Sequence, residues 1–240
     1  MKGTKRLICL ALCLCMLGRW LPAAAQAANA GSTARNEWIS GETIKAKKTG
    51  ATSFNIRGLD GKKDYQTTYR NGGYHTAVSV DGGSKQWEPK NTIASGLQLD
   101  MDLEKYSDTY IKKVQYTLKN TGAKAHTVRV AGYADVMIDN NDRAPICATE
   151  DGGNTLLMTG APQNDYAFRL VATTCDTVWY GLWSMRIKEC FTDLENRGPD
   201  YVYSRDSGLA YSWTATVRPG EEWSRYVLIG TGSEEQRRSR

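Results

Sequence analysis

Histidine is scarce in this 240-residue sequence, which holds only His75 and His126, and no Cys-x-x-Cys pair occurs. Zinc sites draw on histidine and cysteine ligands at short spacings, so the sequence does not predict a zinc centre. A Gly-x-Ser-x-Gly segment is absent as well. That absence removes the usual signature of an α/β-hydrolase nucleophile.

Long apolar runs are also few. The longest is residues 7–17, which follows Lys2, Lys5 and Arg6, and its 11 residues are too few to span about 30 Å of hydrocarbon. A basic start, a short apolar core and the small residues of 23–30 are typical of a secretory signal. We expect residues 1–27 to be a signal peptide that directs secretion, with an uncleaved anchor as the alternative. No second apolar stretch is long enough to cross a membrane.

An excess of positive charge is missing from the expected mature chain. The full sequence has 31 basic and 26 acidic residues, and removing the four basic residues of the signal leaves 27 against 26. No basic patch interleaved with aromatic residues is present, so nucleic acid is not an expected partner. We expect a polar leader at 28–36, one β domain at 37–231 and a charged tail at 232–240.

Three cysteines lie outside the signal: Cys147, Cys175 and Cys190. In an oxidising compartment one pair can form a disulfide and leave one thiol over. Three pairings are open, and we favour Cys175 with Cys190. No cysteine lies in a recognisable nucleophile signature, so a buried or bridged structural role is the better interpretation.

Short segments with alternating apolar residues dominate the rest of the chain. They predict strands over residues 52–57, 67–69, 74–80, 155–158, 166–172, 177–183, 209–217 and 223–229. Asp-Gly and Asn-Gly pairs between several of them are turn signals. Residues 114–118 and 128–138, joined by a turn at 120–122, predict a long antiparallel hairpin. Residues 185–194 give the one expected short helix, and residues 218–221 predict a type II turn.

Many short strands separated by turns predict an all-β fold with two packed antiparallel sheets or a barrel. The aromatic residues fit this interpretation, because the chain has 13 Tyr and 7 Trp against 3 Phe. Rings with a polar group suit sheet faces that are half exposed. We therefore expect an antiparallel β-sandwich with at most one short helix.

The segment from Val114 to Pro145 has a strand, an Asn-Thr-Gly turn, a strand that ends in Tyr-Ala-Asp, and an Asn-Asp-x-Ala-Pro stretch. With residues 177–184, 206–213 and 225–232, it resembles β-sandwich domains of secreted and surface proteins of Gram-positive bacteria. Those domains often accompany adhesive repeats. Their shape is similar to the supersandwich of galactose-mutarotase-like modules. The resemblance implies a supersandwich fold and a role at a surface, and it implies no catalytic residues.

Three aromatic residues form the first candidate site: Trp179, Tyr180 and Trp183. On a strand, Trp179 and Trp183 share one face because their spacing is even. Exposed, the two rings would make a stacking platform for sugars. Buried, they would simply belong to the core, and the sequence leaves both interpretations open.

Acidic residues at the end of an expected strand form the second candidate site. Asp135, Asp139 and Asp142, with the two asparagines between the last two, offer the oxygen ligands that calcium prefers. The same residue types also stabilise loops by bonding their own backbone. No other cofactor is expected.

Three functions remain open from the sequence. The first is a secreted protein that binds a glycan or a surface protein, and it predicts an accessible aromatic patch. The second is a small extracellular carbohydrate-active enzyme of hydrolase, lyase or epimerase type. It predicts a pocket where acidic side chains converge with shifted pKa values. The third is a purely structural module of the cell envelope, which predicts neither feature.

Overall fold

The computed structural model describes residues 39–40, 43–61, 63–106, 111–149, 154–160, 164–185, 201–202 and 205–233. These residues belong to one compact unit that extends from Ala34 to Arg240. The expected signal peptide, the polar leader, the helix beyond Met185 and the tail from residue 234 lie outside the described residues. Among the described residues, no helix is both long enough and apolar enough to span a bilayer.

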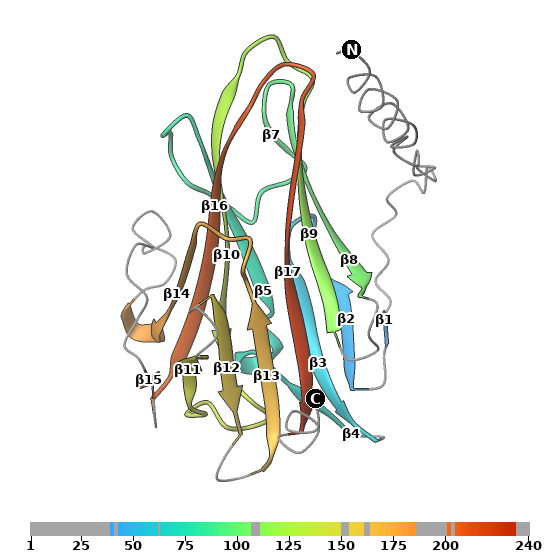
Figure 1. Ribbon diagram of the computed structural model, residues 1–240, viewed down its shortest axis with the longest axis vertical. Helices are drawn as coiled ribbons and strands as arrows, with labels where there is room; N and C mark the ends of the chain where they lie inside the picture. Colours follow the sequence, from blue (N-terminus) through green and yellow to red (C-terminus); the bar gives the residue numbers. More distant parts are fainter. Residues whose placement is uncertain are drawn as a thin grey trace, which may run out of the picture. The chain divides into compact units, whose positions relative to one another are not determined.

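Two antiparallel sheets make up the described fold (Figure 1). The strands of the first are β1 (Ile39–Ser40), β2 (Ile44–Lys48), β3 (Phe54–Asp60), β4 (Lys63–Gln66), β5 (Tyr74–Val80), β6 (Gln86–Trp87), β10 (His126–Val136), β14 (Thr177–Leu182) and β16 (Ser207–Val217). Its order is β1-β2-β3-β5-β10-β16-β14, with β4 paired to β3 and β6 paired to β5. We call it the nine-stranded sheet.

The second sheet has eight strands. They are β7 (Thr92–Ala94), β8 (Leu97–Lys105), β9 (Ile111–Asn120), β11 (Ile146–Ala148), β12 (Thr155–Thr159), β13 (Tyr166–Val171), β15 (Tyr201–Val202) and β17 (Glu222–Ser233). Their order is β15-β11-β12-β13-β17-β9-β8-β7. The only helical segments among the described residues are two short 3-10 turns, η1 (Tyr69–Asn71) and η2 (Trp183–Met185). The predicted all-β sandwich is confirmed.

Alternation places one face of each sheet in a shared core. On β8, leucine and methionine are buried at every second position while the polar residues between them, Gln98, Asp100 and Asp102, are exposed. Aromatic residues extend the core across the two sheets. The Trp213 indole donates a hydrogen bond to the Thr174 carbonyl at 2.8 Å, and the hydroxyls of Tyr116 and Tyr211 lie 3.0 Å apart. These polar groups are buried with partners, as a stable core requires.

The predicted hairpin of residues 114–118 and 128–138 is wrong. Both strands exist, but β9 pairs with β8 and β17, whereas β10 pairs with β5 and β16 in the other sheet. The turn at 120–122 therefore carries the chain between sheets. The buried Asn120 side chain holds it, because its amide donates to the carbonyls of Lys124 and Val217. An amphipathic pattern fixes which face of a strand is buried and leaves its partner open.

Other local predictions had mixed outcomes. The turn at residues 218–221 is confirmed, with Gly220 at φ +77° and a 3.0 Å hydrogen bond from the Glu221 amide to the Arg218 carbonyl. Residues 67–69 do not form the expected strand, because β4 ends at Gln66 and η1 follows. The nine-residue strand β8 was not predicted, although its sequence alternates regularly.

Candidate functional site

The nine-stranded sheet has a second cluster of apolar side chains on the face that points away from the eight-stranded sheet. We call this the outer face. Along β10, Val130 and Ala134 belong to the core between the sheets, so residues 131, 133 and 135 point the other way. The outer-face cluster consists of Ala77, Ala131, Tyr133, Trp179 and Ala210, with Trp183 packed against them. The outer face therefore has its own packed side chains.

Three carboxylates meet beside this cluster. Asp135 lies on the outer face of β10, Asp142 follows that strand, and Asp206 directly precedes β16. Strand pairing brings them together, because Asp135 is opposite Gly208. One oxygen from each carboxylate lies within 4.8 Å of the others. We call Asp135, Asp142 and Asp206 the acidic cluster.

The electrostatics of the acidic cluster disfavour full ionisation. Burial, followed by the charges of Asp206 and Asp142, raises the pKa of Asp135 to about 7. Burial also raises the pKa of Asp142, against a lowering effect of Arg143, and burial with the charge of Asp142 raises the pKa of Asp206. One oxygen of Asp135 and one of Asp142 are buried and have no hydrogen-bond partner within the described part of the chain. The cluster is therefore suited to hold a proton, or to accept hydrogen bonds from a ligand.

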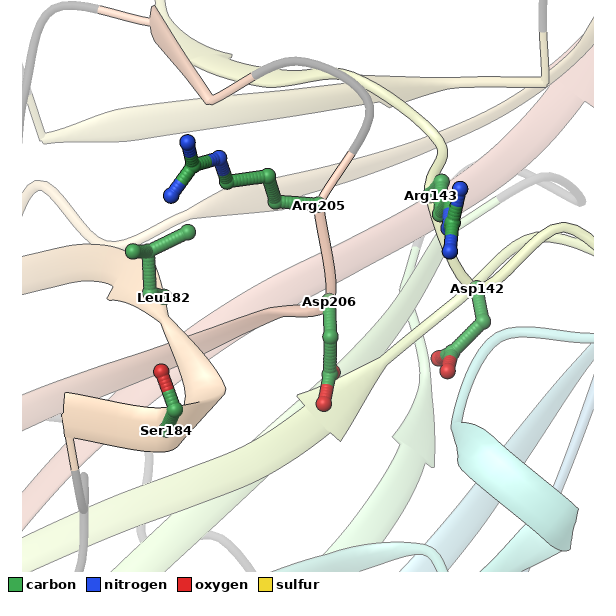
Figure 2. Close-up of a pocket in the computed structure, with 6 residues that line it drawn as sticks. All are labelled: Asp142, Arg143, Leu182, Ser184, Arg205 and Asp206. Carbon is green, nitrogen blue, oxygen red and sulfur yellow. The ribbon is translucent and has the colours of Figure 1, made fainter.

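A pocket of about 410 Å³ opens beside the acidic cluster (Figure 2). Figure 2 shows the Asp142 and Asp206 carboxylates on the same side of the pocket. The backbone amide of Trp183 donates a hydrogen bond to the Asp206 carbonyl at 3.1 Å. This bond holds the half-buried Trp183 next to a residue that lines the pocket. The lining residues are Asp142, Arg143, Leu182, Ser184, Arg205 and Asp206.

The predicted aromatic residues separate in the structure. Trp179 and Trp183 both lie in the outer-face cluster, but Trp179 is only 5% exposed. Tyr180 is 2% exposed and packs in the core between the sheets, which corrects its expected place at a binding surface. Alternation is the reason, since Tyr180 has the opposite orientation to its neighbours on β14. Of the three residues, Trp183 has the most accessible ring.

The predicted calcium site changes in composition. Asp135 and Asp142 do come together, but Asp139 lies 3.3 Å from the Lys63 ammonium and has no place in the acidic cluster. Asp206 takes its place. Calcium binds six to eight oxygen ligands, which carboxylates, carbonyl groups and waters can supply. The described acidic cluster would supply part of such a shell, and calcium binding stays a prediction.

Sequence reasoning did not single out Arg143, although it directly follows Asp142, and it missed Asp206 and Arg205 because these two are remote from Asp135 along the chain. Only the β10–β16 register brings them close. Cys175 is buried and packs in the core, and Cys190 lies outside the described residues, so the predicted pairing of these two cysteines stays a prediction.

No protein-family model matches the sequence. No curated protein matches it either. Two solved structures are similar in part: a bacterial glucoamylase complexed with acarbose, and a protein provisionally named a kojibiose phosphorylase from the human microbiome. The first has a TM-score of 0.46 and 10% identity over 82% of this chain, and the second 0.44 and 6% over 84%. The chain spans about a third of each, 32% and 31%. At these scores the likenesses establish no shared activity.

Proposed function

We propose that this chain is a secreted protein that binds a carbohydrate in the pocket beside the acidic cluster. The observation that supports the proposal most directly is the mixed lining of that pocket. Asp142 and Asp206 accept hydrogen bonds, whereas Arg143 and Arg205 donate them. A sugar hydroxyl both donates and accepts, so such a lining matches a ligand that is rich in hydroxyl groups.

The buried carboxylate oxygens strengthen this argument. Among the described residues, Oδ1 of Asp135 and Oδ1 of Asp142 are buried without a hydrogen-bond partner. Leaving a buried acceptor unsatisfied costs about 1–3 kcal/mol, which favours a protonated carboxyl group, and a protonated carboxyl group can both donate and accept as a sugar hydroxyl requires. The half-buried Trp183 packs against the outer-face cluster next in sequence to the pocket residues Leu182 and Ser184, and it offers an apolar ring to the C–H face of a sugar.

The test is a glycan-array screen of the mature chain, residues 28–240, with Asp206→Asn and Arg205→Gln as pocket variants. Asp139→Asn is a matched control, because Asp139 is a half-exposed acid that pairs with Lys63 outside the pocket. We expect saturable binding that both pocket variants weaken and the control retains. Binding that all variants share equally would place the ligand elsewhere, and no binding to any glycan would refute the proposal.

A second candidate function is acid–base catalysis on a glycoside, and the raised pKa of Asp135 favours it. A carboxyl group whose pKa is about 7 holds a proton that it can donate at neutral pH. The carboxylate oxygens lie within 4.8 Å of one another, which is closer to the roughly 5 Å spacing of retaining glycosidases than to the wider inverting spacing.

Hydrolysis of aryl glycosides tests this second function. The reaction should proceed with retention, its rate should fall above about pH 7 as Asp135 ionises, and Asp135→Asn should abolish it. A glycan that binds in the pocket and is never cleaved would leave carbohydrate binding as the function.

A further inference from the structure

Trp87 is the more exposed of the two large exposed hydrophobic side chains among the described residues, with 40% of its surface accessible. It belongs to the two-residue strand β6, where it pairs with Ala77 of β5. Ala77 is a member of the outer-face cluster. The Trp87 ring meets the Tyr133 ring edge-on, with centroids 5.7 Å apart. Trp87 therefore projects from the outer face, the same face that bears Asp135.

The residue after Trp87 is held in a sparsely populated conformation. Glu88 has φ +48°, which is uncommon for a residue other than glycine. Its amide donates to the Thr76 carbonyl at 2.7 Å, and its carboxylate lies 3.0 Å from Nδ1 of His75. The His75 ring in turn stacks on Tyr133, with centroids 5.5 Å apart. Such backbone conformations concentrate at ligand sites, and here one fixes a polar pair beside an accessible ring.

Trp87, with Glu88 and His75 beside it, lies on the same outer face of the nine-stranded sheet as Asp135 of the acidic cluster. Tyr133, which contacts both Trp87 and His75, precedes Asp135 by two residues on β10. Strand register places Trp87 opposite Ala77, and Ala77 opposite Ala131, four residues before Asp135. Four residues advance about 13 Å and two strand spacings add about 10 Å across the sheet, so the backbones at Trp87 and Asp135 are separated on the order of 16 Å. That is roughly the span of three linked sugar rings.

We infer that the outer face carries a second sugar subsite at Trp87, with Glu88 and His75 as its polar contacts. This inference rests on the proposed carbohydrate binding and adds a substrate class: the ligand is an oligosaccharide of at least three units. One end occupies the pocket beside Asp206, and a more distant unit stacks on the Trp87 ring. The exposed ring supplies apolar contact, while the His75–Glu88 pair supplies a donor and an acceptor for hydroxyl groups.

The experiment is a chain-length series. Oligosaccharide ladders of one to six units, printed for several sugar types, are titrated with the wild-type chain and with Trp87→Ala. Trp87→Phe keeps an aromatic ring, and Tyr106→Ala removes the other large exposed ring, which is 37% accessible. Because Trp87 is exposed, its truncation leaves the core intact, and a denaturation midpoint checks this for every variant.

We expect wild-type affinity to rise with chain length up to three or more units. Trp87→Ala should abolish that rise, so that its affinity for the longest oligosaccharide is about tenfold weaker than the affinity of the wild type. The affinity for one sugar unit should be unchanged. Trp87→Phe should restore most of it, and Tyr106→Ala should match the wild type. Binding that is independent of chain length, or of Trp87, would overturn the subsite while leaving pocket binding in place. No binding to any ladder would refute the proposed function and this inference with it.

Discussion

The replacement Asp135→Asn is expected to stabilise the protein at alkaline pH and to have little effect at acidic pH. The folded-state pKa of Asp135 is about 7, well above the usual value of 3.8. A carboxyl group whose pKa is raised in the folded state destabilises that state when the group is ionised. Stability is therefore highest below about pH 4, and it is lost as the pH rises from 4 to 7.

The size of this effect follows from the shift. About three pKa units at 1.36 kcal/mol each give an upper limit of about 4 kcal/mol. Asp135 is only partly buried, and water screens part of its interaction with the other acids. We therefore expect the stability gain of Asp135→Asn to grow by about 2–3 kcal/mol between pH 4.5 and pH 8.

Urea denaturation of wild type and Asp135→Asn at the two pH values measures this growth directly. Asp139→Asn is the control, because Asp139 lies outside the acidic cluster and pairs with Lys63. A gain that is equal at both pH values, or a loss at both, would contradict a protonated Asp135. In that case burial and the two neighbouring carboxylates would not raise the pKa of Asp135.

Two further predictions concern other sites, and a third concerns calcium at the acidic cluster. Asn120→Ala should cost about 3 kcal/mol in urea denaturation, since Asn120 is buried with three hydrogen bonds, and the exposed Asn140→Ala should cost little. Lys112→Met should stabilise by about 1–3 kcal/mol at pH 7, because burial lowers the pKa of the Lys112 amine, which has no hydrogen-bond partner among the described residues. That gain should shrink above about pH 10, where the unfolded amine is neutral too. If the acidic cluster binds calcium, titration of calcium into the wild type should release or absorb heat, and Asp206→Asn should abolish that signal. The absence of a signal in both proteins would contradict calcium binding.

The fold class was predictable because it depends on local pattern. Alternating apolar residues in 114–118 and 209–217 identify buried strand faces, and Pro219-Gly220 identifies a turn. Strand partners depend on long-range packing, which no single segment encodes. For that reason the predicted hairpin was wrong, although both of its strands were right.

In the candidate site, too, local groupings were predictable from the sequence and long-range contacts were not. Asp135, Asp139 and Asp142 were predicted to lie together because they are close in sequence, and two of them, Asp135 and Asp142, do so. Asp206 was missed because only the register of β10 with β16 brings it within reach. The predicted position of Tyr180 at a binding surface was wrong for a different reason. The sequence shows that this strand is rich in aromatic residues, but which of them are buried depends on which face of the strand the other sheet covers.

Isothermal titration of the strongest glycan-array ligand into wild type, Asp206→Asn and Asp139→Asn is the most direct test of carbohydrate binding in the pocket. The two variants make the same chemical change, one at the pocket wall and one beside Lys63. We predict at least tenfold weaker binding for Asp206→Asn and unchanged binding for Asp139→Asn. Equal affinity in all three proteins would contradict it.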